Sequence, residues 1–162
     1  MVHEVTDFVA AVSQAKGGNL YAYVDGNPVG AIDPLGLRGL TACETQTLQP
    51  YFPNFDLSQI DVQSVPSWLP TGDFTGITVG NQIFIKGDVP DSSATIAILG
   101  HEITHSTQYA DQGTAMFLAT YAGAYALNLL AGMSSDNAYK NIPQEQAGYA
   151  TGTAITNALR KH

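Results

Sequence analysis

The sequence predicts an α+β domain that is mostly helical, with a small β-hairpin beside one central helix. Three observations predict this class. Hydrophobic residues make up 44% and charged residues only 12% of the chain, which is typical of a compact globular core. Two β-rich runs meet at Gly80-Asn81, and three helical patterns follow them. A length of 162 residues favours one domain, or one domain with an appendage.

The N-terminal region, residues 1–37, differs in its residue pattern from the rest of the chain. A short helical pattern comes first, and a string rich in turn residues follows it. In that string, an Asp-Gly and an Asn-Pro dipeptide separate the β-prone runs 20–24 and 29–32, so we expect a small hairpin. Residues 38–70 are predicted to be loop-rich, because four prolines interrupt every helical pattern, with one helical turn at about 43–48.

Residues 77–86 are predicted to form a hairpin or a bulged strand, and Pro90 ends the sheet. Asp91 and the serines after it are typical N-cap residues for a helix over about 92–109. We expect two more helices, at about 114–133 and, with a weaker pattern, at about 144–160. The central helix carries its apolar residues on one face, which predicts that it lies in the interior.

The composition excludes two classes of partner. Six Lys and Arg stand against fourteen Asp and Glu, which gives a net charge of -8. So few cations cannot neutralise a run of phosphates, and we therefore expect no nucleic acid and no anionic membrane surface as partner. Residues 112–135 carry no charge, but they contain glycine, threonine and asparagine; a buried helix is favoured over a membrane span, which stays as the alternative.

The segment His101-Glu-Ile-Thr-His105 carries the chemistry. Two histidines four residues apart lie on one face of a helix, so both imidazoles can reach one ion. Glu102 then lies beside the metal, where it can take a proton from a water that zinc has activated. This is the zincin arrangement, and it predicts bound Zn²⁺. With Cys43 as the single cysteine, any metal must be held by histidine and carboxylate. The alternative is a pair of helix-surface histidines, which the apolar neighbours of the motif disfavour.

A third protein ligand is needed to leave one coordination position open. The acidic residues that follow the motif are Asp111, Asp136 and Glu145. Asp111 falls near the expected end of the helix, and Asp136 is predicted to lie in a turn. Glu145 lies just inside a helix that Pro143 opens, where a carboxylate can project rigidly toward a neighbouring helix. We expect Glu145 to be the third ligand, with Asp136 as the alternative.

Other residues near the motif have candidate roles in binding or catalysis. Tyr139 and Tyr149 flank Glu145, and either phenol can donate a hydrogen bond to a developing oxyanion, although tyrosines also fill cores. Gln108 is expected to orient a ligand or a loop rather than to react. The β-rich segment before the motif can pair with an extended peptide substrate, and substrate choice is expected to depend on loops such as residues 65–75.

The string over residues 17–37 resembles the closing segment of the core of Rhs/YD-repeat proteins. The fixed positions of their P-x-x-x-x-D-P-x-G-L boundary are Pro28, Asp33, Pro34, Gly36 and Leu37 here. In that family the boundary precedes a variable C-terminal toxin domain and is a self-cleavage site, with Asp33 as the matching aspartate. The resemblance implies a core-terminal leader at 1–37 and a toxin domain at 38–162. We expect the chain to stay whole, because 36 residues cannot form the β-cage that accompanies cleavage in the family.

Residues of about 70–150 resemble the HExxHxxQ metallopeptidase domains of Rhs and related polymorphic toxins. The resemblance rests on the segment from Gly100 to Gln108 and on the string Tyr139-Lys-Asn-Ile-Pro-Gln-Glu-Gln-Ala-Gly-Tyr149. In those domains the first Glu of an N-P-x-E-x-E-A-Y string completes the zinc site, and Glu145 matches it. Two positions depart from the string: Ala147 replaces its second Glu, and Gly148 replaces the Ala that follows.

Together these features predict a zinc-dependent peptidase of gluzincin type that acts as a bacterial toxin effector. The resemblance also implies a cognate immunity protein as partner. Residues 1–18 contain two acidic residues and no basic segment before their apolar run, so we expect delivery without a signal peptide, by a contact-dependent or type VI-like route. Two alternatives remain at this point: a degenerate Rhs fragment that serves as an interaction module, and a zinc amidase or peptidase that acts on peptidoglycan.

Overall fold

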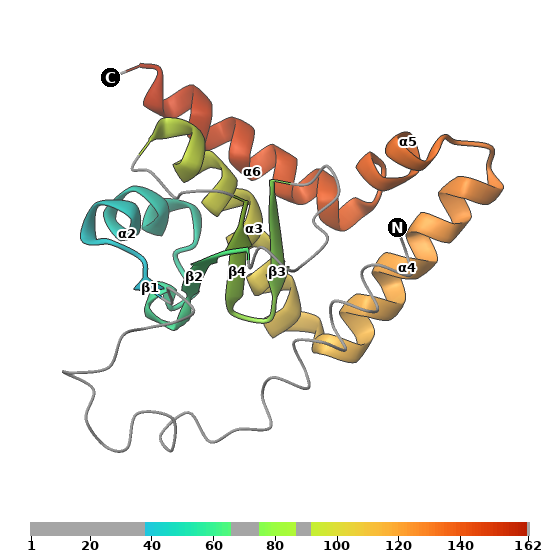
Figure 1. Ribbon diagram of the computed structural model, residues 1–162, viewed down its shortest axis with the longest axis horizontal. Helices are drawn as coiled ribbons and strands as arrows, with labels where there is room; N and C mark the ends of the chain where they lie inside the picture. The colour runs from blue at the N-terminus through green and yellow to red at the C-terminus, as the bar shows by residue number, and fades with distance from the viewer. Residues whose placement is uncertain (1–37, 66–74, 87–91, 162) are drawn as a thin grey trace.

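The computed structural model describes residues 38–65, 75–86 and 92–161 (Figure 1). The hairpin expected before residue 37, the boundary motif with Asp33, and Asp91 lie outside the described residues, as does most of the 65–75 loop. The described part is α+β and mostly helical, as the sequence predicts. Its elements are, in chain order, β1 (Arg38–Gly39), α2 (Ala42–Leu48), the 3-10 turns η1 (Gln49–Tyr51) and η2 (Leu57–Gln59), β2 (Asp61–Ser64), β3 (Gly76–Val79), β4 (Gln82–Ile85), α3 (Ser93–Gln112), α4 (Thr114–Leu130), α5 (Ser135–Lys140) and α6 (Pro143–Leu159).

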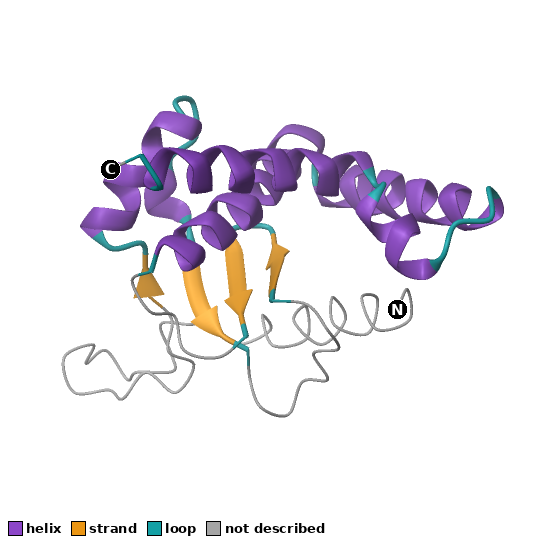
Figure 2. Ribbon diagram, turned by 90° about the horizontal axis from the view of Figure 1, so that it is seen from above, coloured by secondary structure: helices purple, strands orange, loops and turns teal. Residues whose placement is uncertain are grey.

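The four described strands form one sheet in the order β1-β2-β4-β3. β3 and β4 make the predicted antiparallel hairpin, and Gly80, at φ +61°, supplies the left-handed residue of its turn. β2 pairs in parallel with β4 and antiparallel with β1. In Figure 2 the helices lie on one side of this sheet; α3 packs on β3 and β4, and α6 packs on α3. The sheet therefore serves as a support for the central helix.

The prediction of a loop-rich segment over residues 38–70 is wrong in part. β2 lies within it and buries Val62 completely, because it fills the space between β1 and β4. The expected helical turn is the longer helix α2, which begins with a capping box between Thr41 and Glu44. The Arg38 guanidinium joins β1 to α2, because it donates two hydrogen bonds to the buried Glu44 carboxylate, at 2.7 and 2.8 Å. Pro50 lies in the 3-10 turn that follows, so α2 ends where proline predicts.

The main core lies where α3 crosses the sheet and meets α6. Ile83, Leu99, Ile103 and Ile155 are fully buried there. α3 and α6 approach closely at Gly100, since a Cβ at this position would lie 2.1 Å from the Ile155 side chain. This close packing fixes the face of α6 that is turned toward α3 and thereby positions the first turn of α6 relative to the motif helix.

Helix α4 is not the buried helix that its uncharged sequence predicts. Phe117 and Tyr125 are its buried residues, whereas Leu127 is 67% and Leu130 84% exposed. The helix extends away from the sheet and packs at its far end on α5, so it has fewer described neighbours to cover it (Figure 1). Among the described residues, no helix is both long and apolar enough to cross a membrane.

The other helices differ from prediction at their boundaries. α3 extends to Gln112 and α4 stops at Leu130, before Gly132 at φ +86°. Asp136 was expected in a turn, yet it lies in the short helix α5, where Ser134 caps the N-terminus and Lys140 bonds to Asp136 at 2.7 Å. α6 begins at Pro143, within one residue of the expected start.

Candidate metal centre

Helix α3 places the three residues of the motif at the meeting point of the sheet, α4 and α6. Ser92 caps this helix through its hydroxyl oxygen, which accepts a bond from the Thr95 amide. One turn separates His101 from His105, and their Nε2 atoms lie 3.1 Å apart. Glu102 and His105 are buried, while one edge of His101 faces a cavity. The helix thus directs both imidazoles toward one point.

Glu145 reaches the same point from the first turn of α6. Its Oε2 lies 3.2 Å from His101 Nε2, and its Oε1 lies 3.3 Å from His105 Nε2. Within the described ranges, the group of side chains able to hold one metal ion is His101, His105 and Glu145, with ligand atoms within 4.8 Å of one another. Asp136 and Asp111 do not join this group. Asp136 is exposed and paired with Lys140, and Asp111 is exposed at the end of α3.

A hydrogen-bond chain fixes the tautomer of His105. The Gln108 amide nitrogen donates to the Gln144 carbonyl at 3.3 Å, so its oxygen is the atom that faces His105 Nδ1 at 3.0 Å. Nδ1 therefore carries a proton, so in the neutral imidazole, the form that binds a metal, the lone pair is on Nε2. Gln108 consequently orients a candidate ligand, as the sequence indicates, and joins α3 to α6.

The ligand atoms converge on a point that a cation can occupy. Glu145 Oε2 is buried and has no hydrogen-bond partner, although His101 Nε2 is close to it. The Nε2 of His105 faces the Nε2 of His101 and the carboxylate, and in the neutral imidazole it presents a lone pair to them. Lone pairs that converge in a buried site repel one another unless a proton or a positive ion lies between them. Two imidazoles and one carboxylate form a set that zinc takes in catalytic sites.

Tyr121, on α4, holds the Glu145 carboxylate in place, and sequence reasoning did not find it. Its hydroxyl donates to Glu145 Oε1 at 2.6 Å. Burial raises the pKa of Glu145, but His101, His105 and Tyr121 together lower it well below its usual range. Glu145 is thus an anion at neutral pH, as a ligand must be. A tyrosine in an uncharged helix, 24 residues before its partner, looks like a core residue in the sequence.

We expect Tyr121→Phe to weaken zinc binding by about 10- to 100-fold, because the carboxylate loses the partner that orients it. A competition titration with a chromophoric zinc chelator measures this affinity. Tyr125→Phe is the matched control, since Tyr125 is a buried tyrosine on the same helix and in the apolar cluster against which Tyr121 packs, but the bond to Glu145 comes from Tyr121. Equal affinities for Tyr121→Phe and the unmodified chain would contradict the role.

Glu102 lies beside the two histidines and against strand β3. Thr78 donates from its hydroxyl to Glu102 Oε2 at 2.7 Å, and Gly76 leaves room for the carboxylate, because a Cβ there would lie 2.7 Å from Oε1. Burial raises the pKa of Glu102, and His105, His101 and Thr78 only partly oppose this effect. A buried carboxylate with a raised pKa, next to the candidate metal ligands, is suited to accept and release a proton.

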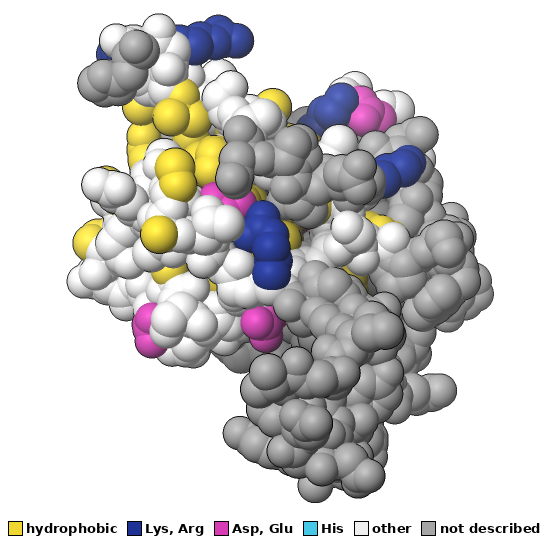
Figure 3. Space-filling model, turned by 60° about the vertical axis from the view of Figure 1, so that its left-hand side comes forward, with side chains coloured by type: hydrophobic (Ala, Val, Ile, Leu, Met, Phe, Trp, Pro, Cys, Tyr) yellow, Lys and Arg dark blue, Asp and Glu magenta, His cyan; other side chains and the backbone are white. Residues whose placement is uncertain are grey.

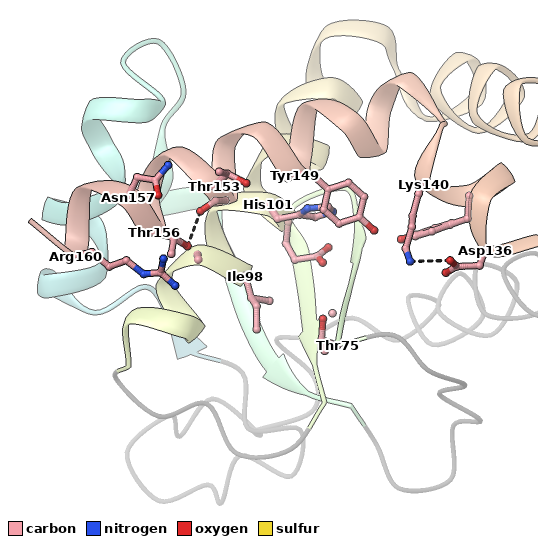
Figure 4. A pocket seen from close by; sticks show the side chains of 15 residues that line it. Thr75, Ile98, His101, Asp136, Lys140, Tyr149, Thr153, Thr156, Asn157 and Arg160 are labelled. Carbon is pink, nitrogen blue, oxygen red and sulfur yellow. Dashed lines mark hydrogen bonds and ion pairs between the residues drawn. The ribbon is translucent and has the colours of Figure 1, made fainter.

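A cavity of about 590 Å³ opens beside His101 and Glu102 (Figure 4). Tyr139 and Tyr149 line it, and the Tyr149 ring stands at 63° to His101 with 4.8 Å between ring centroids. Burial and the nearby Glu145 raise the pKa of both tyrosines, so both keep the phenolic proton at neutral pH. Gly148 lies against His101, where a Cβ would come within 2.7 Å of the ring, which gives a physical reason for glycine here.

One comparison with known proteins finds a match. A family model described as the eCIS core domain matches residues 46–113, which is less than half of the chain. The match extends from α2 across the sheet to the end of α3, so it contains the motif helix but not Glu145. No curated protein and no solved structure matches the chain.

Proposed function

We propose that the chain is a zinc-dependent peptidase of gluzincin type with a zincin-like site. The observation that carries the proposal is the convergence of two imidazole Nε2 atoms and the unpartnered Glu145 Oε2, with Glu102 beside them. The histidine pair alone also fits a structural metal site. The buried Glu102, which is not a member of the ligand group, favours a hydrolase over a structural site.

In this proposal His101, His105 and Glu145 hold the metal. Bound zinc would lower the pKa of water toward about 7 and polarise a carbonyl group. Glu102 accepts a proton from the attacking water while the water oxygen forms its bond to the carbonyl carbon. Glu102 then gives that proton to the leaving amine as the C–N bond breaks. Thr78 holds the Glu102 carboxylate during both transfers. Gln108 keeps His105 in the required tautomer.

Two further features support a peptide substrate. Tyr139 and Tyr149 line the cavity as protonated phenols, and either can donate to the oxyanion that forms on the carbonyl. β3 lies at the end of the described sheet, so its outer edge has no described strand beside it. An extended peptide can add to such an edge through main-chain hydrogen bonds.

The role of an injected toxin rests on two separate signals. The match to the eCIS core domain associates residues 46–113 with contractile injection systems. The resemblance of residues 17–37 to an Rhs boundary points to a cargo domain that follows a carrier. On the face shown in Figure 3, the described Lys and Arg side chains stand apart from one another, which agrees with a protein or peptide target rather than nucleic acid. A cognate immunity protein would be the natural partner of such a toxin.

Zinc content and cleavage of a peptide library test the proposal together. We expect one zinc per chain by plasma mass spectrometry, cleavage of internal peptide bonds, loss of cleavage after chelation, and recovery on addition of zinc. Cleavage of purified peptidoglycan but of no peptide in the library would favour the cell-wall hydrolase. Bound zinc without any hydrolysis would favour the interaction module, because the fold would then keep a metal site without turnover.

A further inference from the structure

The cavity extends from His101 along one face of α6. Tyr149, Thr153, Thr156, Asn157 and Arg160 line it, and their spacing of three and four residues places them on one side of the helix. In Figure 4 Arg160 lies at one end of this row and Lys140 at the other, with His101 and Tyr149 between them. His101, one of the three candidate metal ligands, thus faces a groove that continues past Tyr149 to Arg160.

The two ends of the groove differ in their charge balance. Lys140 is paired with Asp136 at 2.7 Å, so that end has no uncompensated charge. Arg160 is exposed and makes no ion pair with any residue in the described ranges. The side chains between His101 and Arg160 are neutral: Ala97, Thr153, Thr156 and Asn157. In a chain of net charge -8, an unpaired guanidinium at the end of a neutral groove offers one charged contact to a bound substrate.

The length of the groove limits which substrate group reaches Arg160. Arg160, the C-cap of α6, follows Tyr149 by eleven residues, which is about 16 Å at 1.5 Å per residue. An extended peptide advances about 3.3 Å per residue, so this distance corresponds to about five residues. A carboxylate at Arg160 would therefore belong to a residue about five positions from the scissile bond. A distance of about five residues between Arg160 and the scissile bond disfavours an exopeptidase, which binds the terminal carboxylate next to the bond that it cleaves.

Building on the peptidase assignment, we propose that Arg160 is a specificity-determining residue that selects extended peptides with an acidic side chain about five residues from the scissile bond. An exposed ion pair stabilises a complex only modestly. We therefore expect about two- to fivefold tighter binding of an acidic peptide than of its neutral counterpart, falling as salt screens the charges.

Fluorescence anisotropy on the zinc-loaded Glu102→Gln chain tests this, because that variant is expected to bind peptide without cutting it. The probes are labelled 14-residue peptides that carry Glu, Gln or Lys at one position, which is moved along the peptide. The Glu peptide should bind more tightly at one position. Arg160→Gln should remove the preference, and Arg160→Glu should replace it with a preference for Lys. Lys161→Gln is the matched control, an exposed cation that does not line the cavity.

Equal binding of Glu and Gln peptides at every position, or a preference that survives Arg160→Gln, would overturn the role of Arg160. Cleavage by the unmodified chain reports separately on the proposed function. Intact cleavage without a Glu preference refutes the specificity alone. A Glu preference that depends on Arg160, in a chain that cleaves no peptide, supports the role of Arg160 in peptide binding and refutes the proposed peptidase activity.

Discussion

Glu102→Gln is expected to leave the zinc content of the chain unchanged and to reduce the rate of peptide hydrolysis by about 10²- to 10⁴-fold. Glutamine has the shape of glutamate and can still accept the Thr78 hydroxyl bond through its amide oxygen, so the fold around β3 should persist. It cannot accept the proton of the attacking water. Metal analysis and the initial rate on one cleaved peptide measure the two effects on the same sample.

Asp111→Asn is the matched control for this change, because Asp111 is an exposed acid on the same helix. Its rate should equal that of the unmodified chain. A Glu102→Gln chain with full activity would remove Glu102 from the mechanism. Loss of zinc in Glu102→Gln would instead make Glu102 a determinant of the metal site, which contradicts its place outside the ligand group.

Local signals predicted the elements that carry the motif. The two β-rich runs on either side of Gly80-Asn81 predict a hairpin or a bulged strand, and the structure forms the hairpin. The serine cap and the apolar face predict α3, which the structure also confirms. Pro143 marks the start of α6 because proline fits the first turn of a helix. Each of these signals acts within a few residues, so no knowledge of tertiary contacts is needed.

The sequence could not show features that depend on contacts between distant segments. β2 is short and carries polar residues at both ends, and it becomes a strand because it pairs with β4 some twenty residues later. Exposure of α4 depends on how few elements pack against it, not on its composition. Thr78 and Tyr121 are ordinary strand and helix residues until the fold brings them to Glu102 and Glu145. Sequence reasoning therefore missed the contacts of Thr78 and Tyr121, whereas it named the motif residues, Glu145 and Gln108.

Glu145→Ala should abolish stoichiometric zinc binding, with a loss of affinity greater than the about 10- to 100-fold that removal of a supporting partner causes. The change removes one of three candidate ligand atoms and the negative charge that offsets the ion. It also leaves the Tyr121 hydroxyl without its acceptor. Glu145→Gln separates charge from packing, since it fills the same volume without the charge and should also bind zinc poorly. A chelator competition titration compares both variants with the unmodified chain.

Asp136→Ala is the decisive control, because Asp136 is the other acid that the sequence offered as third ligand. Its carboxylate is exposed and bonds to Lys140 within α5, an i,i+4 pair that contributes only about 0.3–0.5 kcal/mol to the free energy of unfolding. We expect Asp136→Ala to bind zinc as the unmodified chain does and to unfold at nearly the same temperature. Circular dichroism of every variant shows whether lost binding reflects lost folding. Folded Glu145→Ala that stays loaded, with Asp136→Ala empty, would transfer the third ligand to α5 and overturn the metal centre described for α3 and α6.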